Sequence, residues 1–196
     1  VGDKMGYNND GEVGWLGFFG QLEYGTENFD AFVSSSIQKT SYQRIEYFLY
    51  DLSTEAGRDL ATSEKIKLDG YSIKGGANFR LDDVQNVFAN IGYFERPAAF
   101  NAVFNGFNNT KINRDAENEK VFSLELGYGV RAEKFAANLN VYRTQWNDRT
   151  FSRSVPALEP GAEDYTANLL GVNALHQGIE FDFTYKPSND LNFSGM

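Results

Sequence analysis

Apolar and polar residues alternate along two adjacent stretches near the middle of the chain, Lys120 to Arg131 and Phe135 to Trp146. In the first, the apolar positions are Phe122, Leu124, Leu126, Tyr128 and Val130, and in the second they are Phe135, Ala137, Leu139 and Val141. A helix would place apolar residues three and four apart, whereas a period of two predicts strands with one apolar face. The pattern therefore predicts an antiparallel hairpin with a tight turn at residues 132–134.

The same alternation recurs along the chain and predicts an all-β protein of about eight strands in four hairpins. The expected strands are about residues 13–24, 29–38, 70–80, 87–96, 120–131, 135–147, 174–186 and 191–196. Short, turn-forming segments close the hairpins, and long connections at about residues 39–69, 97–119 and 148–173 join one hairpin to the next. Within the first long connection, residues 53–60 are expected to form a helical turn capped by Ser53.

Two environments explain strands with one apolar face. In a soluble sandwich the apolar face packs on a core, whereas in an outer-membrane barrel it meets lipid and the polar face lines the lumen. Strict alternation of short and long connections is typical of the barrel. The aromatic residues of the apolar face also gather near the short turns, as in an interfacial girdle: Tyr24, Phe29, Phe79, Tyr128, Phe135, Tyr185 and Phe193. An antiparallel transmembrane β-barrel spanning residues 1–196 is thus the preferred architecture.

Composition narrows the choice of partners. The net charge of −9 argues against nucleic acid, whose partners are basic, and the absence of cysteine excludes disulfides and thiolate metal sites. No apolar run reaches the roughly 20 residues that a transmembrane helix needs. The chain begins without an initiator Met, and its last predicted strand is shorter than a spanning strand. We therefore expect a segment of a longer protein that would aggregate alone.

Few residues suggest chemistry. His176 has no second His or Cys at ligand spacing, so neither a metal nor another cofactor is expected. Glu180 and Asp182 share a strand face and resemble an acid–base pair, but lining of a wet lumen is the simpler reading, and no enzyme activity is expected. The predicted lumen-lining residues are Glu125, Asn138, Asn140, Glu180 and Asp182.

The long loops are the better candidates for ligand binding, because binding residues concentrate on loops held by a rigid scaffold. Aromatic, charged and amide side chains in two of these loops suit sugar, peptide or chelate ligands. The candidates are Tyr42, Arg44, Tyr47, Tyr50, Phe100, Phe104, Phe107, Asn108 and Asn109. The alternative is that these residues only pack the loops together.

Several motifs carry a family likeness. The segment Asn118–Tyr128 (NEKVFSLELGY) resembles the strand motif of TonB-dependent outer-membrane receptors, with Asn118 where those receptors usually have Pro. The segment Gln177–Pro187 (QGIEFDFTYKP) resembles a later strand of the same barrels, and WNDR at residues 146–149 lies between them. The likeness extends back to GYFERP at residues 92–97, and the abundance of Asn and Tyr resembles receptors of Bacteroidetes.

The resemblance implies a bacterial outer-membrane transporter of 22 strands that takes up a scarce solute, such as a siderophore, glycan or peptide. Its partners would be membrane lipid, a plug domain of the same chain, the TonB energy-transducing complex and a surface lipoprotein. Gly75 and Gly76 would permit strand bending or close approach of the plug. The alternatives are a small closed barrel with a structural or adhesive role and a barrel hydrolase, which a single His makes a poor choice.

Overall fold

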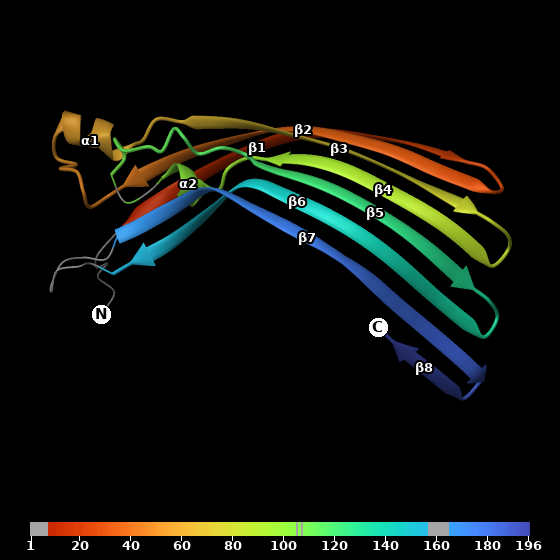
Figure 1. The fold of residues 1–196 in the computed structure, drawn as a ribbon. Helices are drawn as coiled ribbons and strands as arrows, with labels where there is room; N and C mark the ends of the chain where they lie inside the picture. Colours follow the sequence, from red (N-terminus) through yellow and green to blue (C-terminus); the bar gives the residue numbers. More distant parts are fainter. Residues whose placement is uncertain (1–7, 105, 107, 157–164) are drawn as a thin grey trace.

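The computed structural model describes residues 8–104, 106, 108–156 and 165–196. They form one antiparallel sheet of eight strands in sequence order, β1 to β8, which confirms the all-β prediction. The strands are β1 Asn9–Gly25, β2 Phe29–Glu46, β3 Ile66–Arg80, β4 Gln85–Arg96, β5 Glu119–Arg131, β6 Phe135–Val155, β7 Tyr165–Ser188 and β8 Leu191–Gly195. Short turns lie at one end of the sheet, and the long connections with two helices, α1 (Glu55–Ala61) and α2 (Phe100–Val103), lie at the other (Figure 1).

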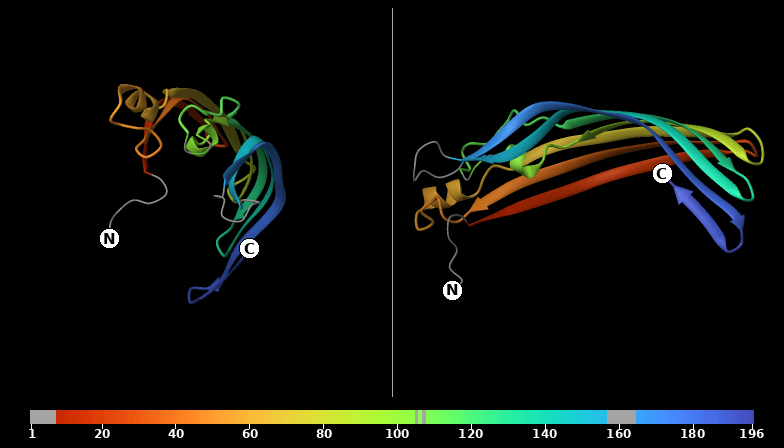
Figure 2. Two further views of the ribbon diagram at one scale, coloured as in Figure 1. Left: turned by 90° about the vertical axis from the view of Figure 1, so that its left-hand side faces the viewer. Right: turned by 60° about the horizontal axis from the view of Figure 1, so that its bottom comes forward.

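The sheet is curved, so that its two faces differ in exposure. Viewed along the strands it forms an arc, with α2 on the inner side (Figure 2). Along β5 the outward Phe122, Leu124 and Leu126 are exposed, whereas the intervening inward residues are less accessible. A soluble domain would bury such a face, and large apolar patches left exposed mark contact with a partner or a membrane.

The apolar residues of neighbouring strands are in register and form a continuous outer band. Tyr128 pairs with Leu139, which pairs in turn with Phe181, and Val141 pairs with Ile179. Ile179 is 72% exposed. The predicted division of β5, β6 and β7 into one apolar and one polar face is therefore confirmed, and the band continues around the outside of the arc.

Both edges of the outer band are marked by aromatic or charged residues. At the edge nearer the long loops the rings of Tyr71 and Tyr93 lie 5.7 Å apart, and beyond them Lys39 forms an ion pair with Asp69 (3.5 Å). At the other edge lies the predicted girdle, including Phe79. From Tyr71 to Phe79 the strand covers about 26 Å, or about 20 Å along the axis of a barrel with strands tilted by about 40°, close to the apolar height of such barrels.

β2 and β3 are longer than the sequence predicts on the side of the long loops, and β1 likewise begins at Asn9 instead of about residue 13. The expected loop at 39–69 is reduced to residues 47–65, because β2 continues to Glu46 and β3 already begins at Ile66. Beyond Lys39, β2 continues past the edge of the apolar band. Both of its faces carry polar residues there, and the alternation of apolar and polar residues disappears. Backbone pairing nevertheless continues, as between Thr40 and Leu68.

The expected loop at 148–173 is largely strand as well. β6 extends to Val155 and β7 begins at Tyr165, with Arg153 opposite Ala167. Register shifts on either side of Arg149 interrupt the pairing, and left-handed backbone at Asp148 (φ 57°) and Gly171 (φ 68°) accompanies them. An extra residue shifts every following side chain to the other face, which hides the period of two from sequence analysis.

The helices differ from prediction in detail. α1 begins one residue later than expected: its cap is Thr54, whose hydroxyl accepts a hydrogen bond from the Gly57 N–H (3.0 Å), rather than Ser53. α2 has four residues and no side-chain cap, and nothing in the sequence indicated it. Within the described ranges, neither helix has the length and apolar character needed to cross a membrane.

The face assignment predicts opposite effects for two adjacent substitutions in β6. Leu139→Arg would place a charge on the outer band and should lower stability by about 2–4 kcal/mol or block membrane insertion. Asn138→Arg should be tolerated, because Asn138 faces the inner side, where its Nδ2 donates to Asp182 Oδ1 (3.0 Å). Heat-modifiability on gels and urea unfolding would measure both, and equal behaviour of the two variants would disprove the assignment.

Candidate functional site

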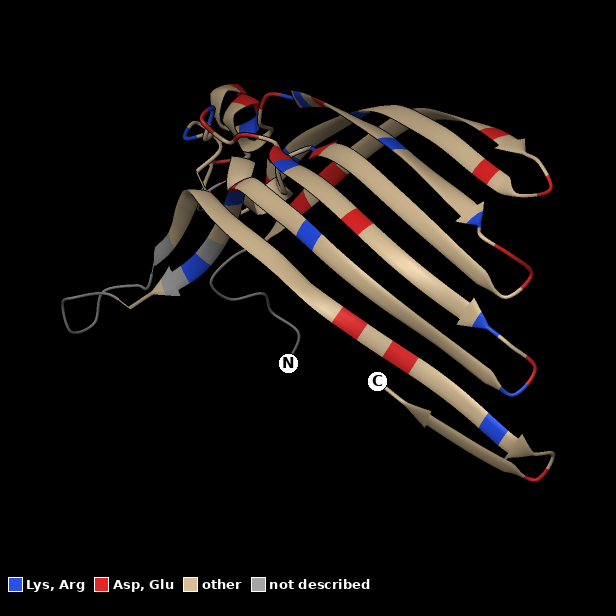
Figure 3. Cartoon of the chain, turned by 45° about the vertical axis from the view of Figure 1, so that its right-hand side comes forward, with Lys and Arg blue, Asp and Glu red and all other residues tan. Residues whose placement is uncertain are grey.

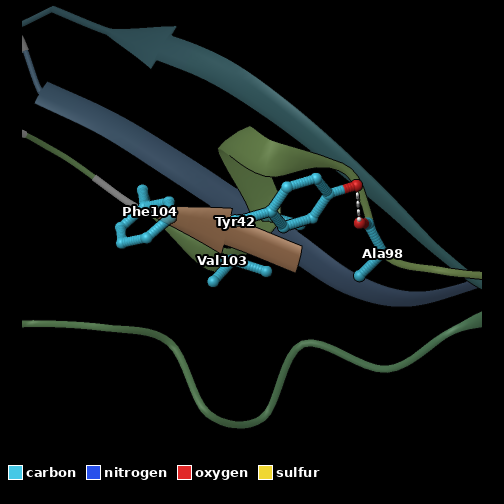
Figure 4. Close-up of a cluster of buried hydrophobic side chains, with 5 residues drawn as sticks. Tyr42, Ala98, Val103 and Phe104 are labelled. Atoms are coloured by element: carbon cyan, nitrogen blue, oxygen red, sulfur yellow. Dashed lines mark hydrogen bonds between the residues drawn. The ribbon is translucent and has the colours of Figure 1, made fainter. Parts of the chain in front are cut away.

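The end of β2 and the two long connections that follow it meet on the inner side of the sheet. A buried cluster of Tyr42, Ala98, Ala102, Val103 and Phe104 holds α2 against β2 (Figure 4). The Tyr42 hydroxyl donates to Ala98 O (3.1 Å), and its ring meets Phe100 edge to face at 5.5 Å. The β4–β5 connection is thereby fixed to a strand more than fifty residues earlier.

Arg44, two residues further along the same face of β2, joins three segments. It is 4% exposed; its Nε donates to Asn109 Oδ1 (2.8 Å), one terminal nitrogen donates to Gly106 O, and its guanidinium lies 5.1 Å from the centre of the Phe104 ring. A buried cation is costly unless hydrogen bonds and ring faces replace water. The β4–β5 connection supplies these partners, so the loop and the charge stabilise each other.

Asn109 joins the two long connections. It is 5% exposed, and its Nδ2 donates to Ala61 O (2.6 Å) and Leu60 O (3.1 Å) at the end of α1. Its backbone N–H donates to the Tyr50 hydroxyl (2.9 Å). We call this arrangement of Arg44, Tyr50 and Asn109 the loop clip. It ties the β2–β3 and β4–β5 connections into one unit.

The hydroxyls of Tyr50 and Tyr47 extend these contacts. The Tyr50 hydroxyl donates to Asn108 Oδ1 (3.1 Å), and the Tyr47 hydroxyl donates to Asp10 Oδ2 (2.9 Å) at the start of β1. The hydrogen bond to the Asp10 carboxylate raises the pKa of Tyr47 above its ordinary value, which keeps the hydroxyl in its donor form. The first long connection is therefore fixed to β1 as well as to its neighbour.

Most of the loop residues singled out from the sequence thus lie together, but they contact one another. Tyr42, Arg44, Phe104 and Asn109 are buried, so the geometry gives them a role in loop packing, which was the alternative interpretation. Tyr42 and Arg44 belong to β2 rather than to a loop. Phe107 lies outside the described residues. Direct ligand binding by this set stays a prediction.

Sequence analysis missed two participants on either side of the clip. Ser63 donates its N–H to Arg44 O (2.8 Å) and accepts from Arg44 N–H through its Oγ (2.9 Å). Glu46 is 1% exposed, and its carboxylate accepts from the Phe48 N–H (3.0 Å). Thr40, Tyr42, Arg44 and Glu46 alternate along β2, so a strand extended past residue 38 would have placed Glu46 on the same face.

The predicted lumen residues lie on the inner face of the arc. Besides Asn138 and Asp182, which bond to each other, Asn140 stands opposite Glu180 in the pairing of β6 with β7. Glu125 of β5 accepts from Asn90 Nδ2 of β4 (3.2 Å). These amide–carboxylate contacts form a polar inner wall. Many of the other charged residues lie near strand ends and connections, whereas Lys74 and Arg143 lie inside β3 and β6 (Figure 3).

Among the described residues no three His, Asp or Glu side chains group closely enough to hold a metal ion. His176 stands inside β7 opposite Thr144, because β7 begins well before residue 174. Glu180 and Asp182 are two residues apart on β7 and therefore lie on the same face of the strand, with the other residues of the inner wall.

Solved structures with a similar fold are transporters and receptors. The copper transporter OprC superposes with a TM-score of 0.70 at 17% identity, over 92% of this chain and 28% of OprC. The siderophore receptor PirA from Pseudomonas aeruginosa gives a TM-score of 0.59 at 12% identity, over 94% of this chain and 42% of PirA. This chain thus spans well under half the length of either protein. Comparison with curated protein sequences gave no match.

The sequence itself matches a family along nearly its whole length. Residues 3–195 fit the family described as TonB dependent receptor-like, beta-barrel. The match covers every strand of the sheet, including those whose apolar faces point outward, and it agrees with the motifs at residues 118–128 and 177–187. This chain therefore belongs to the β-barrel family of TonB-dependent receptors.

Proposed function

We propose that this chain is part of the barrel of an outer-membrane transporter that takes up a scarce solute with energy delivered through TonB. The observation that carries the proposal is the family match over residues 3–195. The outer apolar band and the polar inner wall support it, because they suit a barrel with lipid outside and a wet lumen inside. In this proposal the chain's partners are outer-membrane lipid, a plug domain of the same protein, the TonB complex and a surface lipoprotein.

The long connections would face the outside of the cell and the short turns the periplasm. Solute binding would then fall to the unit held by the loop clip, together with the lumen wall below it. OprC is named for copper and PirA for siderophores, and both share only the fold with this chain. For this chain we keep the broader class of a siderophore, glycan or peptide, because the clip residues that could recognise a solute are engaged with one another.

The loop clip suggests how such a surface is kept in shape. Loops of about twenty residues without much secondary structure have many conformations, and binding would have to order them. Asn109 and Arg44 instead hold the two loops in one arrangement before a solute arrives. The clip residues then support the binding surface rather than touch the solute.

The transport proposal predicts a growth defect that matches loss of TonB. Deletion of the gene in its own bacterium should impair growth when one nutrient is scarce, as in chelator-treated low-iron medium, low-copper medium or medium with one glycan as carbon source. A TonB deletion should show the same defect, and the double deletion should be no worse. Normal growth of the deletion strain in all such media would contradict the proposal.

The orientation predicts which cysteines react with an impermeant maleimide on intact cells. Asn109 is too buried to report, so the outer probe is Asp59→Cys on the exposed side of α1. Asp59→Cys should be labelled, whereas Glu133→Cys in the turn between β5 and β6 should react only after the outer membrane is opened. Labelling of Glu133→Cys alone on intact cells would reverse the orientation.

The clip predicts that Asn109→Ala loosens the loops without unfolding the barrel. The change removes the amide contacts to Arg44, Leu60 and Ala61 and leaves buried groups unpaired, each costing about 1–3 kcal/mol. Protease should then cut the loops of intact cells faster, and growth on the scarce nutrient should fall, while heat-modifiability is unchanged. Lys111→Ala, an exposed change in the same loop, is the control, and similar cleavage of the two variants would rule out the clip.

A further inference from the structure

Aromatic side chains occur on the inner wall, where a polar lining is expected. Phe32, Phe88 and Tyr142 point inward from β2, β4 and β6, on the same faces as Ser34, Asn90 and Asn138. An aromatic ring that stands upright on the wall of a barrel would project into the lumen. The position of these three rings therefore affects the space that is left inside.

Each of these rings lies across a glycine of the next strand. Phe32 pairs with Gly76, Phe88 with Gly127 and Tyr142 with Gly178. A Cβ atom added to Gly76 would lie 2.6 Å from Phe32 Cε1, and one added to Gly178 would lie 2.9 Å from the Tyr142 hydroxyl. At Gly127 the added atom would overlap Cε1 and Cζ of Phe88. The far edge of each ring thus occupies the space that a side chain on the next strand would fill.

The three contacts recur in a regular way. In each case the aromatic residue comes from the strand before a long connection and the glycine from the strand after it: β2 with β3, β4 with β5 and β6 with β7. Trp15 and Phe94 cover Gly17 and Gly92 within their own strands in a similar way. Strand glycines can also serve only to ease twisting, but that role gives no reason for an inward ring beside Gly76, Gly127 and Gly178.

The space kept clear in this way includes a groove on the inner wall. The groove has a volume of about 650 Å³, lies toward the short turns, and is lined by Phe32, Gly76, Phe88, Asn90 and Lys74, among others. A methyl group at Gly127 would meet the far edge of the Phe88 ring, which can rotate away. A methyl group at Gly76 would meet the amide of Asn90 as well as the Phe32 ring, and would lie 3.2 Å from Ala89 O. Because Phe32 and Phe88 line the groove, a ring displaced from the wall would move toward it.

We propose that Gly76, Gly127 and Gly178 are positioning residues that keep the inward rings against the wall and the lumen open for the transported solute. The inference rests on the proposed transport function. It assigns a role to Gly76 that sequence analysis had left as strand bending or close approach of a plug. The glycines act through the rings, so their effect must disappear when the ring is removed.

The position of a ring can be measured without any transport. In the complete protein carrying Phe88→Trp, acrylamide quenching of the added tryptophan should rise several-fold when Gly127→Ala is introduced, because the ring turns into the lumen. Parallel variants that keep Phe88 supply the background from the other tryptophans. Gly129→Ala is the matched control: it lies on the same strand and face, but its Cβ would meet the amide of Asn86 rather than a ring. Equal quenching in the Gly127→Ala and Gly129→Ala proteins would overturn the proposal.

Growth in the medium where the deletion strain fails tests the consequence. Gly127→Ala should slow growth, Gly129→Ala should not, and all variants should remain heat-modifiable. Adding Phe88→Ala to Gly127→Ala should restore growth to the level of Phe88→Ala alone. A double variant that grows no better than Gly127→Ala would overturn the positioning role, since a purely structural glycine is not rescued by loss of a ring. If the deletion strain grows normally in every medium, the transport proposal fails, whereas the quenching result still decides the ring arrangement.

Discussion

The absence of water in the lipid interior governs this structure more than any single contact. A backbone N–H or C=O without a partner in lipid costs several kcal/mol, so a membrane-spanning sheet must pair continuously along its strands. The register of β2 to β7 fulfils this requirement through the whole outer band. The shifts lie at its margins, around Arg149 on the side of the long loops and between Tyr185 and Ser188 at a short turn. Successive side chains of each strand then point alternately outward toward lipid and inward toward the lumen.

This constraint explains why the membrane part of the fold could be predicted from sequence. Between Tyr71 and Phe79, or Phe122 and Tyr128, one face must be apolar and the other need not be, so the period of two is strong. Beyond Lys39 and Lys120 the strands leave the apolar band. Along β2 one face there packs under the loops through polar side chains such as Arg44 and Glu46, so neither face has to be apolar. The same strands continue there without a hydrophobic signature, which is why β2, β3, β6 and β7 are longer than predicted.

The candidate site was predictable in composition but not in arrangement. Tyr42, Arg44, Tyr50 and Asn109 stand out as aromatic, charged and amide residues near long loops, and the structure does bring them together. Their partners are mostly backbone carbonyls, such as those of Ala61, Ala98 and Gly106, which carry no sequence signal. A pattern of side chains therefore identified the region, whereas the loop clip depends on long-range contacts that only the folded chain shows.

The inner wall also contains contacts between strands that a sequence pattern does not reveal. Phe88 and Phe94 are apolar residues at inward positions of β4, where the period of two predicts polar residues. They make β4 the least regular of the predicted strands. The explanation lies on the next strand, where Gly127 leaves room for the ring of Phe88. An aromatic residue covering a glycine keeps the strand pair packed and shields its backbone without narrowing the lumen. A lumen wall is therefore not defined by polarity alone. Its side chains must not project far into the lumen, and an aromatic ring that lies flat across a glycine meets that requirement as well as an asparagine does.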